Sequence, residues 1–267
     1  MKYLRAITEK TGLAGSYGIL KGETIHLLDR PLFSGEVQET GVFVPLAEVK
    51  RFLPPVDPPN IIALGLNYIE HAKEGKWDLP PAPVIFLKAT TSLAGHLAPI
   101  ILPPEAPSEV DYEAELTIVI GKEAKNVPED KAFDYVFGYT CGNDVSARDC
   151  QMRMDKQWSR AKSFDTFAPV GPVIETELDP SNLAVQSMLN GKVMQDGNTR
   201  DLIFKVPAIV SYLSRQMTLL PQTLIMTGTP PGVGFVRKPP VFLKPGDRIE
   251  VEIEGIGTLV NPVVMER

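Results

Sequence analysis

Three carboxylates in this sequence have a spacing that would bring them together. Glu113 and Glu115 are two residues apart at the start of an apolar run, Leu116–Ile120, that is typical of a buried strand. Residues two apart in a strand point to the same face, so these two side chains would converge. Two carboxylates held together repel each other, and one takes up a proton unless a cation lies between them.

A third carboxylate follows another apolar and aromatic segment, residues 135–139. Asp144 stands in the sequence Gly-Asn-Asp-Val-Ser-Ala-Arg-Asp, residues 142–149. With Glu113 and Glu115 it would form a site of oxygen ligands only, and such hard ligands favour Mg²⁺, Mn²⁺ or Ca²⁺ over Zn²⁺. The Glu-x-Glu pattern alone is also typical of a solvent-exposed strand face, so the site needs further support.

The elements that must position these acids are predicted to be mostly strands. Pro and Gly number 25 and 21 of 267 residues, and such a chain interrupts helices often. Asn190-Gly191 is a strong hairpin signal, and residues 248–254 alternate apolar with charged side chains, as a half-buried strand does. The predicted hairpins span residues 17–28 and 183–191, a final strand spans 258–264, and helices are expected at 129–136 and 207–216.

A proline-rich segment, Phe52-Leu-Pro-Pro-Val-Asp-Pro-Pro, divides the chain. No central strand or helix could contain it, because proline lacks the backbone donor and fixes its own φ. We therefore expect a small N-terminal β domain over residues 1–55 and a catalytic domain over residues 56–267. The fold class is mostly β (α+β).

Composition excludes several functional classes. The formal charge is −6 and the isoelectric point is about 5.2, which argues against a nucleic-acid partner. No apolar run approaches the roughly 18 residues of a membrane span, and the first residues have no signal-peptide pattern. The two cysteines, Cys141 and Cys150, are expected to be reduced packing residues. A cytoplasmic protein without a membrane partner is predicted.

Six ordered segments resemble the fumarylacetoacetate hydrolase family. They run from about Asn60 to the C-terminus and comprise Gly-Leu-Asn-Tyr-Ile-Glu-His-Ala-Lys-Glu (65–74), Phe-Leu-Lys (86–88), Asp-Tyr-Glu-Ala-Glu (111–115), Asn-Asp-Val-Ser-Ala-Arg-Asp (143–149), Lys-Ser-Phe-Asp-Thr-Phe (162–167) and Thr-Gly-Thr-Pro-Pro-Gly (227–232). The resemblance implies the family's β-sandwich roll with a few short helices. It also implies a divalent metal, Mg²⁺ or Mn²⁺ with Ca²⁺ as a further option, on Glu113, Glu115 and Asp144.

The same resemblance assigns catalytic roles to three residues. His71 and Glu74 lie three apart on a short helical turn, where they share a face and can touch. In the family this pair lies on a mobile lid, where the acid orients the imidazole that activates water. Lys162 would reach the metal site and neutralise a substrate oxygen.

Four further residues are expected to bind substrate, namely Lys88, Arg148, Gln151 and Thr229. Lys88 and Arg148 would help to reverse the negative field around an anionic substrate. Arg148 could instead be the structural partner of Asp149, its neighbour in the chain. Gln151 and Thr229 would contribute hydrogen bonds.

The implied activity is metal-dependent hydrolysis of a C–C bond in a small anionic 2-oxo acid or 1,3-diketone, such as an acylpyruvate, fumarylpyruvate or fumarylacetoacetate. The 2-oxo acid would chelate the metal, which would stabilise the enolate that forms. Decarboxylation of oxaloacetate, isomerisation of an unsaturated 2-oxo dioate and dehydration of a sugar acid remain open, as does a catalytically silent metal-binding protein. The resemblance also implies a homodimer and a role in the breakdown of catechols and other aromatic compounds.

Overall fold

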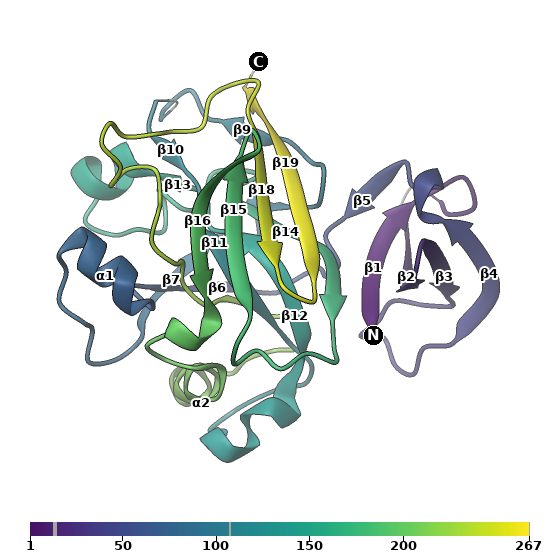
Figure 1. The fold of residues 1–267 in the computed structure, drawn as a ribbon. Coiled ribbons are helices and arrows are strands. Elements are labelled where there is room, and N and C mark those ends of the chain that lie inside the picture. The colour runs from purple at the N-terminus through teal and green to yellow at the C-terminus, as the bar shows by residue number, and fades with distance from the viewer. Residues whose placement is uncertain (13–14, 107, 267) are drawn as a thin grey trace.

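The computed structural model describes residues 1–12, 15–106 and 108–266. Its fold is mostly β with few helices, as the sequence predicts (Figure 1). The largest sheet follows the order β4 (Glu39–Pro45), β3 (Thr24–Leu28), β2 (Ser16–Lys21), β1 (Lys2–Ile7), β14 (Ala168–Glu175), β12 (Val136–Asn143), β11 (Ala114–Ile120), β17 (Leu224–Met226), β6 (Ile61–Gly65) and β7 (Val84–Lys88). Two short strands join it off this path, because β5 (Arg51–Leu53) pairs with β1 and β8 (Leu93–Ala94) pairs with β14.

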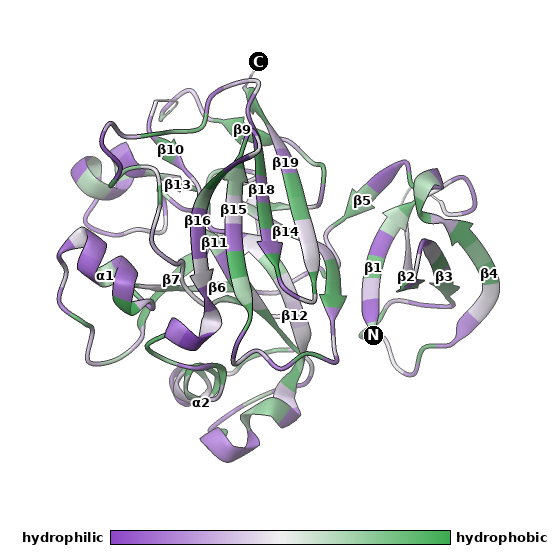
Figure 2. Cartoon of the chain, viewed as in Figure 1, coloured by the Kyte–Doolittle hydropathy of each residue, from purple (hydrophilic) through white to green (hydrophobic). Residues whose placement is uncertain are grey.

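A second sheet packs across the first and closes the core. Its order is β16 (Lys192–Asn198), β15 (Ala184–Leu189), β18 (Arg248–Ile253), β19 (Gly257–Met265) and β9 (Ile100–Leu102). A separate pair consists of β10 (Val110–Asp111) and β13 (Ser146–Ala147). In β18 the apolar side chains are buried and alternate with charged ones, which Figure 2 shows as alternating hydrophobic and hydrophilic colour. All seven residues of β11 are buried, because it lies inside the large sheet and beneath the second one.

The strands of residues 1–53 extend the large sheet. β1 pairs antiparallel with β14 through Lys2↔Glu175 and Tyr3↔Ile174, so these strands are hydrogen-bonded to the rest of the molecule. In Figure 1 they form a lobe on the right, away from α1 and the second sheet. The lobe therefore lies outside the region where the predicted site residues gather.

Helices are short and few. The α-helices are α1 (Ile69–Gly75) and α2 (Val206–Gln216), which match the predicted helical turn and the predicted second helix. The helix expected at 129–136 is instead a 3₁₀ helix over Glu129–Tyr135, because Val136 already begins β12. Further 3₁₀ helices span Leu46–Glu48, Thr90–Ser92 and Thr199–Asp201, and an unpredicted π-helix spans Cys150–Met154.

Both cysteines are buried and unpaired, in line with their predicted packing role. Within the described ranges, no helix has the length and apolar character needed to cross a membrane.

Candidate metal centre and active site

The two central strands of the large sheet bring the three predicted acids together. β11 and β12 pair antiparallel, with Ala114 opposite Asn143 and Glu115 opposite Gly142. Glu113 directly precedes β11 and Asp144 directly follows β12, and the Asp144 N–H donates to the Glu113 carbonyl over 2.9 Å. Asp144 lies 29 positions after Glu115 and 31 after Glu113 in the sequence, but the antiparallel register places all three acids at one end of one strand pair.

The three carboxylates form a compact and buried group. One oxygen from each of Glu113, Glu115 and Asp144 lies within 4.8 Å of the others. Their residues are 7%, 1% and 0% exposed. Buried carboxylates at such distances are costly unless cations compensate their charge.

Two lysines supply part of that compensation. The Lys162 ammonium donates to Glu113 Oε2 over 2.8 Å and to Asp144 Oδ2 over 2.6 Å. Lys88 donates to the other Asp144 oxygen, Oδ1, and is itself buried. Neither Lys88 nor Asp144 is among the described residues that line the cavity, so this ion pair lies behind the cavity wall.

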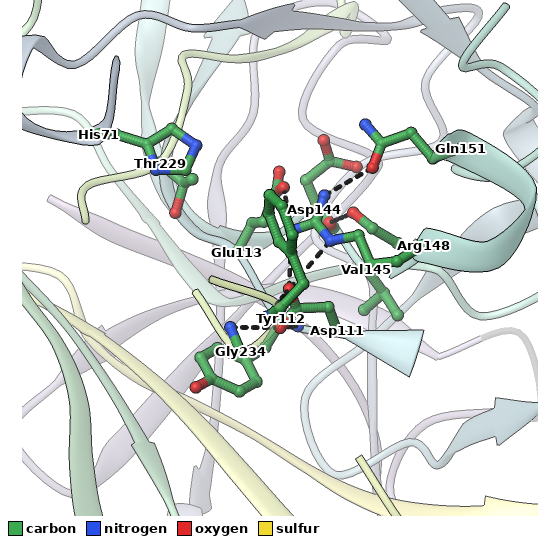
Figure 3. A network of polar contacts seen from close by, with 12 residues as sticks. His71, Asp111, Tyr112, Glu113, Asp144, Val145, Arg148, Gln151, Thr229 and Gly234 are labelled. Atoms are coloured by element: carbon green, nitrogen blue, oxygen red, sulfur yellow. Dashed lines mark hydrogen bonds and ion pairs between the residues drawn. The ribbon is translucent and has the colours of Figure 1, made fainter. Parts of the chain in front are cut away.

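Arg148 also contacts the acidic group, as the dashed lines in Figure 3 show. Its guanidinium donates from Nη2 to Glu113 Oε1 over 2.7 Å, from Nε to Asp111 Oδ2 over 2.9 Å, and from Nη1 to Gln151 Oε1 over 2.7 Å. The alternative prediction, that Arg148 pairs with Asp149, is wrong, because the Asp149 carboxylate accepts instead from the Cys150 N–H. Arg148 and Gln151 both line the cavity, so the two predicted residues do meet there.

Asp111 is a further residue of the site that the sequence analysis does not predict, although it lies inside the Asp-Tyr-Glu-Ala-Glu motif. Besides Arg148 it accepts the backbone N–H groups of Gly234, over 2.7 Å, and Phe235, over 3.1 Å. It thereby ties the arginine to the loop after β17. A side chain at Gly234 would place its Cβ 1.8 Å from the Val241 carbonyl oxygen, so only glycine fits this approach.

The loop after β17 also reaches the carboxylate group. The Gly228 N–H donates to Glu115 Oε2 over 2.8 Å, and Gly228 adopts a positive φ of 98° that favours glycine. Thr229 lines the cavity, but its hydroxyl donates to the Ala114 carbonyl over 3.0 Å and accepts from Gln195 Nε2 over 2.7 Å. The predicted substrate contact of Thr229 therefore competes with an existing structural role.

His71 and Glu74 both lie on α1, close to the carboxylate group. His71 is 6% exposed and lines the cavity, and its ring packs edge-on to Trp77 at 5.5 Å between centroids. The Nδ1 atom lies 3.5 Å from Glu74 Oε2, yet the geometry makes no hydrogen bond between them. The Glu74 carboxylate accepts instead from the Gly232 N–H, at 3.0 Å to Oε2. The two residues of the predicted pair therefore lie close together but are not hydrogen-bonded to each other.

These residues surround one cavity of about 330 Å³. Its polar wall is made by His71, Glu113, Glu115, Arg148, Gln151, Lys162 and Thr229. The rest of the lining is an apolar wall. It consists of Leu64, Leu66, Trp77, Phe86, Met152, Trp158 and Phe235.

Burial and charge set the protonation states in opposite directions for neighbouring acids. Burial alone would raise the pKa of Glu113, but Lys162 and Arg148 hold that pKa well below its usual range. Burial, with Asp144 and Glu113 as repelling neighbours, raises the pKa of Glu115 well above its usual value. Among the described residues, the Gly228 N–H is the one hydrogen-bond donor to Glu115. This acid is therefore the least compensated member of the group.

A divalent cation fits this arrangement. The buried group contains four acids and three cations, which leaves one net negative charge. The acids are Asp111, Glu113, Glu115 and Asp144, and the cations are Lys88, Arg148 and Lys162. An uncompensated Glu115 in a set of hard oxygen donors is the environment that Mg²⁺ or Mn²⁺ stabilises. Such an acidic group is consistent with a divalent metal site.

Family models match nearly the whole chain. The model described as "Fumarylacetoacetate (FAA) hydrolase C-terminal" matches residues 60–264, and the model "Rv2993c-like, N-terminal" matches residues 1–55. The chain belongs to the fumarylacetoacetate hydrolase family. It is accordingly an enzyme of this superfamily, and the resemblance inferred from the six motifs, together with the family's fold, is confirmed.

Individual relatives carry different names. A "fumarylacetoacetate hydrolase domain-containing protein 2 homolog" of Dictyostelium discoideum is 51% identical over 222 residues, which cover 78% of this chain and 72% of that protein. The human mitochondrial "oxaloacetate tautomerase FAHD2A" is 44% identical over 225 residues, 83% of this chain and 71% of its own. The crystal structure of a "2-hydroxyhepta-2,4-diene-1,7-dioate isomerase" from Mycobacterium marinum has 42% identity and a TM-score of 0.87, covering 100% of this chain and 99% of that one.

Proposed function

We propose that the chain is a divalent-cation-dependent enzyme that interconverts the keto and enol forms of a small 2-oxo acid. The observation that carries this proposal is the cavity that brings Glu113 and Glu115 of the buried carboxylate triad together with one imidazole, His71. Moving a proton at the carbon next to a 2-oxo group requires these parts and no attacking water. The names of a tautomerase and an isomerase among the relatives point the same way.

Glu113, Glu115 and Asp144 would hold the cation, Mg²⁺ or Mn²⁺, with Ca²⁺ as a further option. When bound, it would supply a Lewis acid that polarises the 2-oxo group and makes the neighbouring C–H bond more acidic. Lys162 adds a positive charge on the same side of the cavity, beside Glu113 and Asp144. Lys88 lies behind the cavity wall, where its ammonium donates to the Asp144 carboxylate.

His71 is the proposed base. Its imidazole takes the proton from C3 of the 2-oxo acid, the electron pair of that C–H bond forms the C2=C3 double bond, and the carbonyl π pair moves onto the 2-oxo oxygen. That oxygen takes a proton from water to give the enol, and His71 returns its proton to the hydroxide that remains. The Nδ1 atom is buried without a hydrogen-bond partner in the described structure, so the ring is not committed to a structural bond. Trp77 packs against the ring and helps to exclude water. Arg148 is placed to bind the substrate carboxylate at the polar end.

C–C hydrolysis is the second candidate, and the position of Glu74 favours it. Its carboxylate lies 3.5 Å from His71 Nδ1, so a small movement of α1 would complete the pair that activates water. Decarboxylation of oxaloacetate needs only the electron sink and remains a side activity of either mechanism. The functional unit is proposed to be a homodimer acting on a small anionic substrate.

Proton exchange separates these reactions. The protein with Mn²⁺ should replace the C3 protons of 2-oxobutyrate by deuterium in D₂O, which proton NMR follows directly. His71→Asn should abolish the exchange, whereas Glu70→Gln, an exposed neighbour on α1 paired with Lys73, should not. Cleavage of acetylpyruvate without any C3 exchange of 2-oxobutyrate would refute the tautomerase proposal in favour of hydrolysis.

A further inference from the structure

The cavity is lined by two cations and by aromatic rings that lie against them, with Arg148 Cζ 4.3 Å from the Phe235 ring centroid and Lys162 Nζ 5.2 Å from the Phe86 ring centroid. All cationic side chains that line it, Arg148 and Lys162, already contact acids at the triad. No other lysine or arginine among the described residues lines the cavity. A substrate held by its 2-oxo acid group at the triad would therefore direct its other end toward the apolar wall.

The apolar wall is built from rigid aromatic groups. Trp158 meets Phe86 edge-on, at 5.6 Å between ring centroids and 75° between planes. The indole lies so close to Gly65 that a Cβ there would be 2.3 Å from the ring. Leu64 and Met152 complete this side, and Met152 is 53% exposed at the rim. A bound apolar group would remove this surface from water.

Charge balance points to the same kind of substrate. The buried acids and cations leave one net negative charge, which a divalent cation turns into one net positive charge. One substrate carboxylate then neutralises the site. A second carboxylate would bring an excess negative charge into a cavity whose described lining offers no further lysine or arginine, and burying such an unpaired charge is costly.

We propose that the substrate is a monoanionic 2-oxo acid with an apolar tail, and that Trp158 and Phe86 select for that tail. The proposal rests on the proposed function only for the end of the substrate that the triad holds. It distinguishes this chain from relatives whose names specify the dianions oxaloacetate and 2-hydroxyhepta-2,4-diene-1,7-dioate.

A matched pair of ligands tests it. In 4-methyl-2-oxopentanoate, two methyl groups replace the two oxygens of the distal carboxylate of oxaloacetate, so the acids share a shape and differ in charge. Trp77 and Trp158 are the only tryptophans of the chain and both line the cavity, so intrinsic fluorescence reports occupancy. Titrations of the Mn²⁺-loaded protein, checked by calorimetry, give the dissociation constants.

The expected result is binding of 4-methyl-2-oxopentanoate on the order of tenfold or more tighter than binding of oxaloacetate. In the series from 2-oxobutyrate to 2-oxohexanoate, affinity should rise about three- to fourfold per methylene group. Trp158→Ala should reduce the gain in affinity per methylene group, and Trp158→Phe should retain most of that gain. Calorimetry carries the measurement in these variants, where one fluorophore is lost.

Equal or tighter binding of oxaloacetate, or a Trp158→Ala variant with an unchanged series, would overturn the proposal. The two proposals fail in different ways. Deuterium exchange that is faster on oxaloacetate than on 4-methyl-2-oxopentanoate would refute the apolar tail and leave the tautomerase function standing. Tight binding of the apolar acids without any exchange would refute the function and leave the ligand class standing.

Discussion

Gln195 connects the second sheet to the active site through one buried amide. It lies in β16 and is fully buried. Its Oε1 accepts the Ala114 N–H and the Ser187 hydroxyl, both at 3.0 Å. Its Nε2 donates to Thr229 Oγ1 over 2.7 Å and to the Pro230 carbonyl over 2.8 Å. Every hydrogen-bonding position of this amide is therefore used.

Gln195→Leu keeps the approximate volume but removes all four bonds. Three buried groups lose a partner outright, namely the Ala114 N–H, the Ser187 hydroxyl and the Pro230 carbonyl, while the Thr229 hydroxyl keeps its bond to Ala114 O. Each unsatisfied buried group costs about 1–3 kcal/mol. For three groups we expect a total loss of roughly 3–9 kcal/mol in the free energy of unfolding, a large share of the 5–15 kcal/mol typical of a domain.

Activity should also fall, because Ala114 lies between the two glutamates of the triad and Thr229 lines the cavity. Urea unfolding followed by tryptophan fluorescence measures stability, and Mn²⁺ titration of the folded variant measures the displacement of the ligands. Gln186→Leu is the matched control, since this glutamine lies on neighbouring β15 and makes one exposed bond to Asp196, 3.0 Å long. If Gln195→Leu loses no more stability than Gln186→Leu, the role assigned to the buried amide is wrong.

Three other outcomes follow from the charges of the site and of a distant histidine. Mn²⁺ should bind at about one ion per chain, and its affinity should increase as pH rises, because the raised pKa of Glu115 makes the cation displace a proton. Calorimetry should show that Glu115→Gln binds Mn²⁺ at least tenfold more weakly than the wild type. Equal affinity of the two proteins would contradict the site. His71→Asn should slow deuterium exchange by about 10²–10⁴ without changing Mn²⁺ affinity, and an equal loss in Glu70→Gln would point to a folding effect instead. Burial lowers the pKa of His96 to about 4, with Arg248 as a minor cause, and its Nδ1 accepts the Val260 N–H. Because the folded pKa lies below the usual value of about 6.5, the stability contributed by neutral His96 is complete above pH 6.5 or so and is lost as pH falls toward 4. For this partly exposed ring, we expect the free energy of unfolding to fall by about 1–2 kcal/mol more in the wild type than in His96→Gln across this interval. Urea unfolding at several pH values measures the difference.

Local patterns were sufficient to predict much of the fold. Alternation over residues 248–254 predicted β18, and Asn190-Gly191 predicted the turn between β15 and β16, because both features depend on near neighbours. The 3₁₀ helix at Glu129–Tyr135 was assigned as an ordinary helix, since composition does not separate the two hydrogen-bond patterns. The π-helix at Cys150–Met154 gave no signal, because its single wide turn is set by tertiary contacts.

The site was predictable where residue type determines the chemistry and not where geometry does. Glu113, Glu115 and Asp144 were found from spacing and resemblance, and the register of β11 and β12 brings them together. The apolar wall could not be found this way, because Phe86 and Trp158 are 72 positions apart and have no shared pattern.

The cations illustrate the same limit and show why it matters for function. Lys88 and Lys162 were both expected to face the substrate, but each ammonium contacts a different oxygen of Asp144, and only Lys162 lines the cavity among the described residues. A sequence gives the number of charges but not the side from which a cation approaches an acid. That side decides how much positive charge remains for the substrate. Because Lys88 and Arg148 are already committed to Asp144 and to Asp111, the site has an excess sufficient for one carboxylate, and the rest of the substrate must be recognised by burial of apolar surface.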